Sequence, residues 1–225
     1  MSWSSGKDSA WALAETLQAG RFEVAGLLTT VTEGYGRVSM HGVREEILSR
    51  QASAAGLPLT TVRIPPGASN ADYERAFLAA ITRARRAGVE RIVFGDLFLA
   101  DIRAYRERLL EASGVAADFP LWGLDTGVLA REMIAGGLRA RIVCVDPRRL
   151  EASFAGRDFD AALLDDLPAG VDPCGENGEF HTCVTDGPMF AAAVPVERGE
   201  IVLRDGFVFS DLLPVRSRRE ASAAR

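Results

Sequence analysis

Six residues near the start of the chain have the types and spacing of an anion-binding loop. Residues 4–9 read Ser-Ser-Gly-Lys-Asp-Ser, and they run directly into an apolar segment of helical character. Unpaired backbone N–H groups and the positive end of the helix dipole meet at a helix start, so small residues and a lysine there favour a phosphate ligand. The candidate ligands are Ser4, Ser5, Gly6, Lys7, Asp8 and Ser9. A plain helix cap is the alternative interpretation, because Ser and Asp are also good cap residues.

The spacing of this loop excludes a Walker A motif. That motif needs a glycine in the place of Met1 and a Ser or Thr in the place of Asp8. The loop instead resembles the PP-loop of the ATP pyrophosphatase superfamily, which usually has glycine where this chain has Ser5. The resemblance implies that the loop holds the β,γ-pyrophosphate of ATP while a substrate oxygen attacks the α-phosphorus. A serine hydroxyl in place of the glycine can also donate to a phosphate.

A second group of chemically capable side chains lies far along the chain, in residues 172–190. Glu176, Glu179, His181 and Thr182 stand there among glycines, and Glu179 and His181 share a side if their segment is a strand. Carboxylates and an imidazole beside a nucleotide can orient ammonia, accept its proton or help to hold Mg²⁺. A glycine-rich turn whose acids bind the local backbone is the alternative. Without a Cys pair or a His-x-x-x-His helix, a tight transition-metal site is not expected.

The segments between these groups alternate as a parallel α/β fold requires. The pattern predicts a doubly wound, Rossmann-like (HUP-type) parallel sheet of about five strands. Strands are expected at residues 24–30, 59–64, 91–94 and 118–123, and helices at residues 42–55 and 69–86. Only residues 1–3 precede the loop, so either the first strand is a stub or the true start lies upstream.

Ligands of such sheets bind outside the carboxyl ends of the strands. This rule places Thr29, Gly95 and Asp96 beside the nucleotide, and it lets the glycine-rich loop that contains His41 overhang it. We expect residues 1–125 to form the ATP-binding domain and residues 126–215 to form a smaller α+β subdomain on the substrate side. The charged, alanine-rich residues 216–225 are expected to be a frayed tail.

Composition narrows the class of protein. The net charge of −5 disfavours nucleic acid and anionic membranes as partners, and no apolar run is long enough for a membrane span. The three cysteines form no C-x-x-C pair, which indicates a reduced, cytoplasmic protein without a disulfide framework. The length suits one compact body with an appendage and is compatible with a homodimer.

Four motifs in order resemble those of the diphthine–ammonia ligase family of ATP pyrophosphatases. They are the loop at residues 4–9, Gly95-Asp96, Pro-Leu-Trp-Gly at residues 120–123, and Cys-Gly-Glu-Asn-Gly-Glu-Phe-His-Thr at residues 174–182. The resemblance implies that ATP, with Mg²⁺, adenylates a carboxylate on a modified histidine of elongation factor two, and that ammonia then displaces AMP. It also implies catalytic roles for Lys7, Glu176, Glu179 and His181 and an acceptor side lined by these acids, His181 and Thr182.

The resemblance carries the chemistry over to this chain better than it carries over the acceptor, because short members of this family also resemble bacterial proteins that have no such target. Two other functions are compatible with the sequence. One is a regulatory module that binds ATP or AMP without turnover, although a sensor needs no second polar cluster. The other is a tRNA-modifying PP-loop enzyme, which the acidic charge and the lack of a catalytic Cys pair disfavour.

Overall fold

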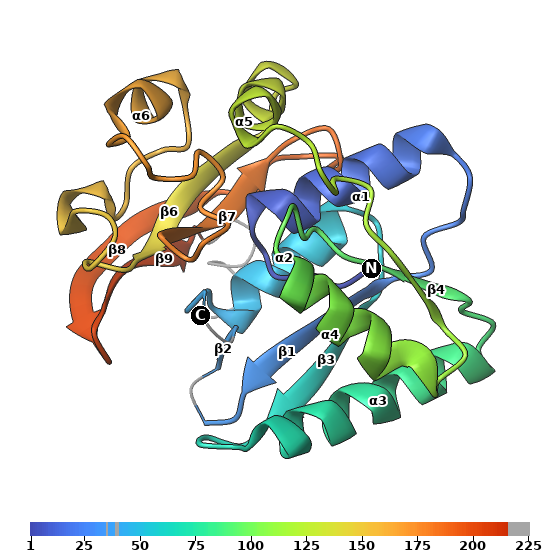
Figure 1. The fold of residues 1–225 in the computed structure, drawn as a ribbon. Helices are drawn as coiled ribbons and strands as arrows, with labels where there is room; N and C mark the ends of the chain where they lie inside the picture. The colour runs from blue at the N-terminus through green and yellow to red at the C-terminus, as the bar shows by residue number, and fades with distance from the viewer. Residues whose placement is uncertain (35, 39–40, 216–225) are drawn as a thin grey trace, which may run out of the picture.

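The N-terminal half has parallel strands flanked by helices (Figure 1). The computed structural model describes residues 1–34, 36–38 and 41–215. The strands of this half are β1 (Leu27–Thr32), β2 (Arg37–Val38), β3 (Leu59–Ile64), β4 (Arg91–Val93) and β5 (Ala116–Asp118). Its helices are α1 (Lys7–Ala19), α2 (Glu45–Ala54), α3 (Asn70–Arg86) and α4 (Ala100–Glu111). The predicted mixed α/β class with parallel strands is confirmed.

Two parallel strand pairs meet at the start of the chain. β1 pairs with β3, and β4 pairs with β5. The Ser2 N–H donates to the Val93 carbonyl at 2.8 Å, and the Trp3 N–H donates to the Leu28 carbonyl at 2.8 Å. Residues 1–3 therefore bind both β1 and β4, and the loop that follows them emerges between these strands.

Three local predictions in this half are wrong. The strand expected at residues 118–123 is β5, which ends at Asp118, and a turn follows because Pro120 has no N–H for a ladder. The helix expected from Gly42 starts at Glu45, since Gly42 has φ 67°, outside the helical range. The glycine-rich loop contains β2, antiparallel to β1, which was not predicted. The proposed tail at residues 216–225 lies outside the described residues.

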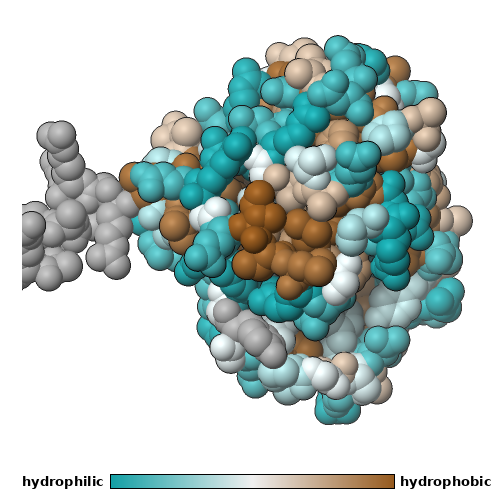
Figure 2. All heavy atoms as spheres, turned by 90° about the vertical axis from the view of Figure 1, so that its left-hand side faces the viewer, coloured by the Kyte–Doolittle hydropathy of each residue, from teal (hydrophilic) through white to brown (hydrophobic). Residues whose placement is uncertain are grey.

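The C-terminal half folds as an antiparallel sheet with short helices. Its elements are α5 (Thr126–Ala135), β6 (Arg139–Val145), η1 (Ala152–Phe154), α6 (Ala161–Asp166), β7 (Phe180–Asp186), β8 (Val196–Arg204) and β9 (Phe207–Pro214). The strand order is β7-β6-β9-β8. Apolar side chains gather on the side of the molecule that this sheet forms (Figure 2), and edge strand β8 exposes Ile201, Val202 and Leu203.

The two halves share one hydrophobic core. Trp3 and Leu13 from the first half lie in the same buried cluster as Val143, Phe180 and Val184 from the second. The Val184 N–H donates to the Ser5 carbonyl at 2.9 Å, so β7 is hydrogen-bonded to the predicted anion-binding loop. Among the described residues, no helix is long and apolar enough to cross a membrane.

Candidate active site

The predicted anion-binding loop lies at the start of α1. Gly6 is the extended N-cap residue, and the Gly6 N–H donates to Ser4 Oγ at 3.2 Å. The Lys7 N–H donates to Thr182 Oγ1 at 3.1 Å, and Ser9 Oγ donates to the Gly6 carbonyl at 3.0 Å. The first-turn N–H groups of a helix have no acceptor inside the helix. The loop therefore presents helix-end donors next to a threonine from the distant C-terminal segment.

Ser5 differs in conformation from most residues with a side chain. Its φ of 74° lies in the left-handed region, which glycine occupies at little cost. The Ser5 hydroxyl is buried and donates to Cys183 Sγ at 3.3 Å. The hydroxyl thus points into the core, and the backbone is the part of Ser5 that the loop offers to a ligand.

Lys7 is buried beneath the loop rather than extended into solvent. Its side chain is 2 % exposed, and Nζ donates to Asp8 Oδ1 and Oδ2 at 2.8 Å and also to the Cys174 carbonyl. Burial opposes the charge on Lys7, but the neighbouring groups, with Asp8 foremost, together raise the pKa of Lys7. Burial also raises the pKa of Asp8. The lysine and its acidic neighbour form a charge pair at the contact between the two halves.

Gly95 lies against the loop because it has no side chain. A Cβ at Gly95 would stand 2.7 Å from the Asp8 carbonyl carbon and 2.7 Å from the Ser9 nitrogen. Asp96, next in the chain, accepts from Arg106 Nε at 2.8 Å. Thr29 lies within β1, is 3 % exposed, and has an Oγ1 without a hydrogen-bond partner among the described residues.

The two glutamates of the C-terminal cluster have different surroundings. Glu176 Oε1 accepts from the Leu97 N–H at 2.8 Å, so it lies beside the residues that follow β4. Burial raises the pKa of Glu176 to about 7, and the charges of Asp8 and Asp96 act in the same direction. Glu179 is buried, and its Oε1 accepts from the Asp172 N–H and from Asn177 Nδ2, both at 3.1 Å. Glu176 has the character of an acid or base near neutral pH, whereas Glu179 holds the turn together.

The two histidines of the chain lie together beside the loop. The ring centres of His41 and His181 are 4.6 Å apart. A Cβ at Gly6 would stand 3.1 Å from His41 Cε1, so His41 contacts the loop. Burial lowers the pKa of His41 to about 3 and that of His181 to about 4. Both rings are therefore neutral at pH 7, and each can donate one hydrogen bond and accept another.

Gln51 is a positioning residue that the sequence analysis missed. It is fully buried on α2, where Trp3 Nε1 donates to its Oε1 at 3.1 Å. Its Nε2 donates to the carbonyls of Ser5 at 3.3 Å and Val184 at 2.7 Å. One side chain thus joins residues 1–3, the loop and β7. The sequence did offer a signal for this role, because Gln51 places an amide on the apolar face of a predicted helix, one turn after Ile47.

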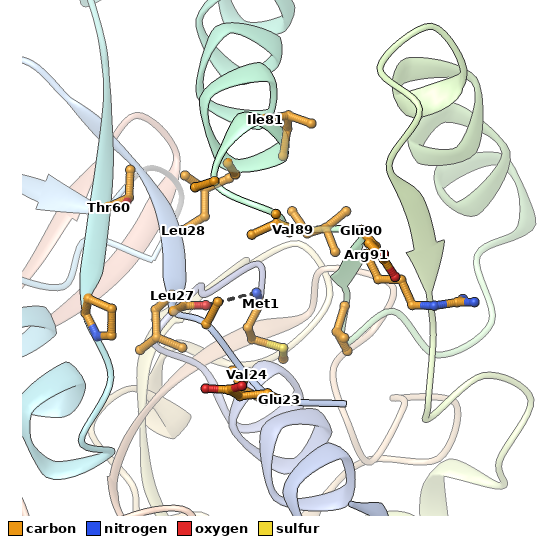
Figure 3. A pocket seen from close by; sticks show the side chains of 18 of the residues that line it. Met1, Glu23, Val24, Leu27, Leu28, Thr60, Ile81, Val89, Glu90 and Arg91 are labelled. Atoms are coloured by element: carbon orange, nitrogen blue, oxygen red, sulfur yellow. Dashed lines mark hydrogen bonds between the residues drawn. The ribbon is translucent and has the colours of Figure 1, made fainter. Parts of the chain in front are cut away.

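A large cavity lies at the opposite end of the parallel strands. It has a volume of about 740 Å³ and is lined by the beginnings of β1, β3 and β4, including Leu27, Thr60 and Arg91 (Figure 3). Ligands of parallel sheets bind at the carboxyl ends of the strands, where the loop lies. This cavity is therefore separate from the candidate site.

Fold and site together define an α/β protein with a PP-type anion-binding loop at the start of a helix and a polar cluster folded against it. The family model of the diphthamide synthase N-terminal domain matches residues 1–117, and that of the C-terminal domain matches residues 125–211. The chain therefore belongs to the diphthamide synthase family.

Several curated relatives are named diphthine–ammonia ligase. The chain is 31% identical to the Rattus norvegicus protein over 102 residues, which is 43% of this chain and 38% of the relative. It is 31% identical to the Homo sapiens protein over 101 residues, with coverage of 43% and 38%. It is 23% identical to the Schizosaccharomyces pombe protein over 217 residues, with coverage of 88% and 36%. The chain thus spans 36–38% of the length of these relatives.

Proposed function

We propose that this chain is an ATP-dependent, AMP-forming ligase that joins a carboxylate to ammonia. The observation that carries this function is the contact between the anion-binding loop and the distant polar cluster. The Lys7 N–H and ammonium group bind Thr182 and Cys174, which lie in the segment with Glu176. A nucleotide sensor would not need this second polar segment. The names of the relatives support the same chemistry.

The parallel strands would act as one nucleotide-binding sheet. Residues 1–3 would be the central strand of a five-strand, HUP-type order β3-β1-(1–3)-β4-β5, which the hydrogen bonds to Leu28 and Val93 support. In this arrangement residues 1–125 bind ATP and residues 126–215 form the substrate side. The loop of residues 4–9 follows the central strand and would hold the pyrophosphate, with Thr29, His41, Gly95 and Asp96 around the nucleotide.

In the first step, an oxygen of the acceptor carboxylate attacks the α-phosphorus of ATP. The bond from this phosphorus to the bridging oxygen breaks, and pyrophosphate leaves with the electron pair. The loop N–H groups and Lys7 stabilise the charge on pyrophosphate. For this contact the Lys7 ammonium exchanges its bond to the Cys174 carbonyl for a phosphate oxygen. Asp8, with 26 % of its side chain exposed, is a carboxylate that fits Mg²⁺, and this ion would neutralise phosphate charge when bound.

In the second step, ammonia attacks the acyl carbon of the adenylate. The new C–N bond forms, the bond to the AMP oxygen breaks, and nitrogen loses one proton. Glu176 would accept this proton, because a base with a pKa of about 7 is effective at neutral pH. His181 and Thr182 would line the acceptor side, and Glu179 would act by holding the turn. The acceptor, free or on a protein, and a homodimeric state remain predictions.

The test is product formation with isotope-labelled ammonium. The protein is incubated with ATP, labelled ammonium and a cell extract as the acceptor pool, and mass spectrometry follows AMP and the labelled amide. We expect both products from the wild type. Glu176→Gln should lower amide formation by ~10²-fold or more while ATP binding stays within a few-fold.

Glu179→Gln is the matched control, because the same isosteric change is made at a buried glutamate whose oxygen bonds the turn. It should lower stability more than it lowers the rate per folded molecule. Binding of ATP without AMP formation, or AMP without label in any amide, would overturn the ligase function and favour the sensor.

A further inference from the structure

A second cavity lies against the C-terminal sheet, and His181 is one of the residues that line it. It has a volume of about 290 Å³, and its lining includes Val38, Cys144, His181, Arg204 and Phe209. This size suits a small molecule or a side chain, near the lower end of the range for ligand sites. His181, which lines the cavity, stacks on His41, and His41 contacts Gly6 of the loop.

The floor of this cavity is a row of side chains across three strands. His181 on β7 lies opposite Cys144 on β6, and Cys144 lies opposite Phe209 on β9. Residues directly opposite each other in an antiparallel sheet point to the same face. Two strand spacings give the row a length of roughly 10 Å. One end of the row therefore lies at the loop, and the other end lies well away from it.

The roof of the cavity depends on a close backbone contact. A Cβ at Gly42 would stand 2.9 Å from Phe209 Cδ1, and Gly42 has φ 67°. The backbone before α2 thus lies directly over the aromatic end of the row. The resulting slot has apolar walls between its two ends.

The end remote from the loop carries an arginine with weak pairing. The Arg204 guanidinium carbon is 4.8 Å from the centre of the Phe209 ring. Its ion-pair partner among the described residues is Asp205 at 3.9 Å, and the Asp205 side chain is 88 % exposed. Arg37, the other cation of the lining, is bound to Asp211 at 2.8 Å and to the Gly42 carbonyl at 2.6 Å. Arg204 is thus the cation available to a ligand.

We propose that this slot is the acceptor subsite and that it takes a small molecule with an apolar body and two carboxylates, an inference that rests on the ligase function proposed above. Arg204 binds one carboxylate, Phe209 and Cys144 contact the apolar body, and the other carboxylate lies at His181 beside the loop. The spacing along the row selects the length of the acceptor. Because the imidazoles of His41 and His181 are neutral, they form no ion pair with the reacting carboxylate, which stays free to approach the α-phosphorus.

The test compares adipate with hexanoate, which has the same chain length but one carboxylate. Calorimetry would measure both affinities for the wild type, for Arg204→Gln and for Arg198→Gln, a control arginine on the same strand that does not line the cavity. We expect adipate to bind the wild type about tenfold more tightly than hexanoate, the scale of one charge-assisted hydrogen bond. Arg204→Gln should abolish this difference, and Arg198→Gln should keep it.

The position of bound adipate is determined from the imidazole NMR signals, because the chain has two histidines and their signals are easily assigned. Adipate should shift the His181 signals of the wild type. Equal affinities for the two acids, a preference that survives Arg204→Gln, or unshifted imidazole signals would overturn the subsite. ATP binding and AMP formation are measured on the same samples. If ATP binding and AMP formation are absent while the preference for adipate still depends on Arg204, the proposed ligase function is wrong and the proposed binding slot is retained.

Discussion

The half-buried histidine pair beside the loop predicts a steep loss of stability in mild acid. Its pKa values of about 3 for His41 and about 4 for His181 lie below the ordinary value of 6.5. An unfolded chain therefore binds up to two more protons than the folded chain between about pH 6.5 and pH 4. The stabilisation is complete above the unfolded value and is lost as the pH falls toward the folded values. Each proton changes the free energy of unfolding by ~1.4 kcal/mol per pH unit, so the pair gives ~2.7 kcal/mol per unit.

Glu176 acts in the opposite direction over part of this range. Because its pKa rises from 4.5 to about 7, the folded chain keeps a proton there that the unfolded chain has lost. The stability that it contributes is complete below the unfolded value and is lost as the pH rises. The slope of the wild-type free energy of unfolding against pH therefore combines the contributions of the histidines and of Glu176. The difference between the wild type and a variant without the histidines isolates their part, because the Glu176 contribution cancels.

The assay is urea unfolding of the wild type and of the double variant His41→Gln/His181→Gln at several pH values from about 5 to about 7. We expect the wild type to lose stability relative to the variant as the pH falls, by ~2.7 kcal/mol per unit at the acidic end. Parallel curves for the two proteins would refute the reasoning. They would mean that the rings titrate equally in the folded and unfolded chains and are not shielded from water in the fold.

Two backbone predictions concern the loop. Ser5→Gly should leave ATP binding intact and, in urea unfolding, should be more stable than Ser5→Ala by ~1 kcal/mol. Both variants lose the hydrogen bond to Cys183, but glycine also relieves the strain of the left-handed backbone. A glycine variant less stable than the alanine variant would contradict this reasoning. Gly95→Ala should lower stability by about 1–3 kcal/mol and weaken ATP binding in calorimetry, because its Cβ would meet the loop backbone at 2.7 Å. Gly127→Ala, on the first turn of α5, is the control, because its Cβ would meet side-chain atoms alone, with Asp125 Oδ1 nearest at 3.3 Å. Equal effects of the two substitutions would contradict the close backbone contact at Gly95.

Elements with strong local signals were predictable from the sequence. The capping box of Ser69 and Asp72 is formed as expected, and α3 follows it. The strand expected at residues 59–64 is β3. The two-residue strand β2 could not be predicted, because so short a strand has no periodicity and exists through its pairing with β1. The turn after Asp118 contains apolar residues of strand type, and Pro120 was the local sign against a strand.

The composition of the candidate site was more predictable than its geometry. Residue types and order located both the loop and the C-terminal cluster, which the structure brings together. They did not show that Glu176 lies beside Leu97 while Glu179 is enclosed in its own turn, since two glutamates three positions apart look alike in sequence. They also did not show that His41 and His181 stack. Such contacts depend on how two distant segments pack, and no local pattern encodes them.

Contacts from both halves of the chain hold the loop of residues 4–9 in its conformation. β7 supplies the acceptor for the Lys7 N–H and the donor to the Ser5 carbonyl, and Gln51 binds Ser5 and Val184 at once. The first half alone would keep the Lys7–Asp8 pair but would lose the Cys174 carbonyl that accepts from the Lys7 ammonium. The left-handed Ser5 would also lose the contacts that offset its strain. Under the proposed function, ATP binding at this loop would require the C-terminal sheet, and β7 would couple nucleotide binding to acceptor binding.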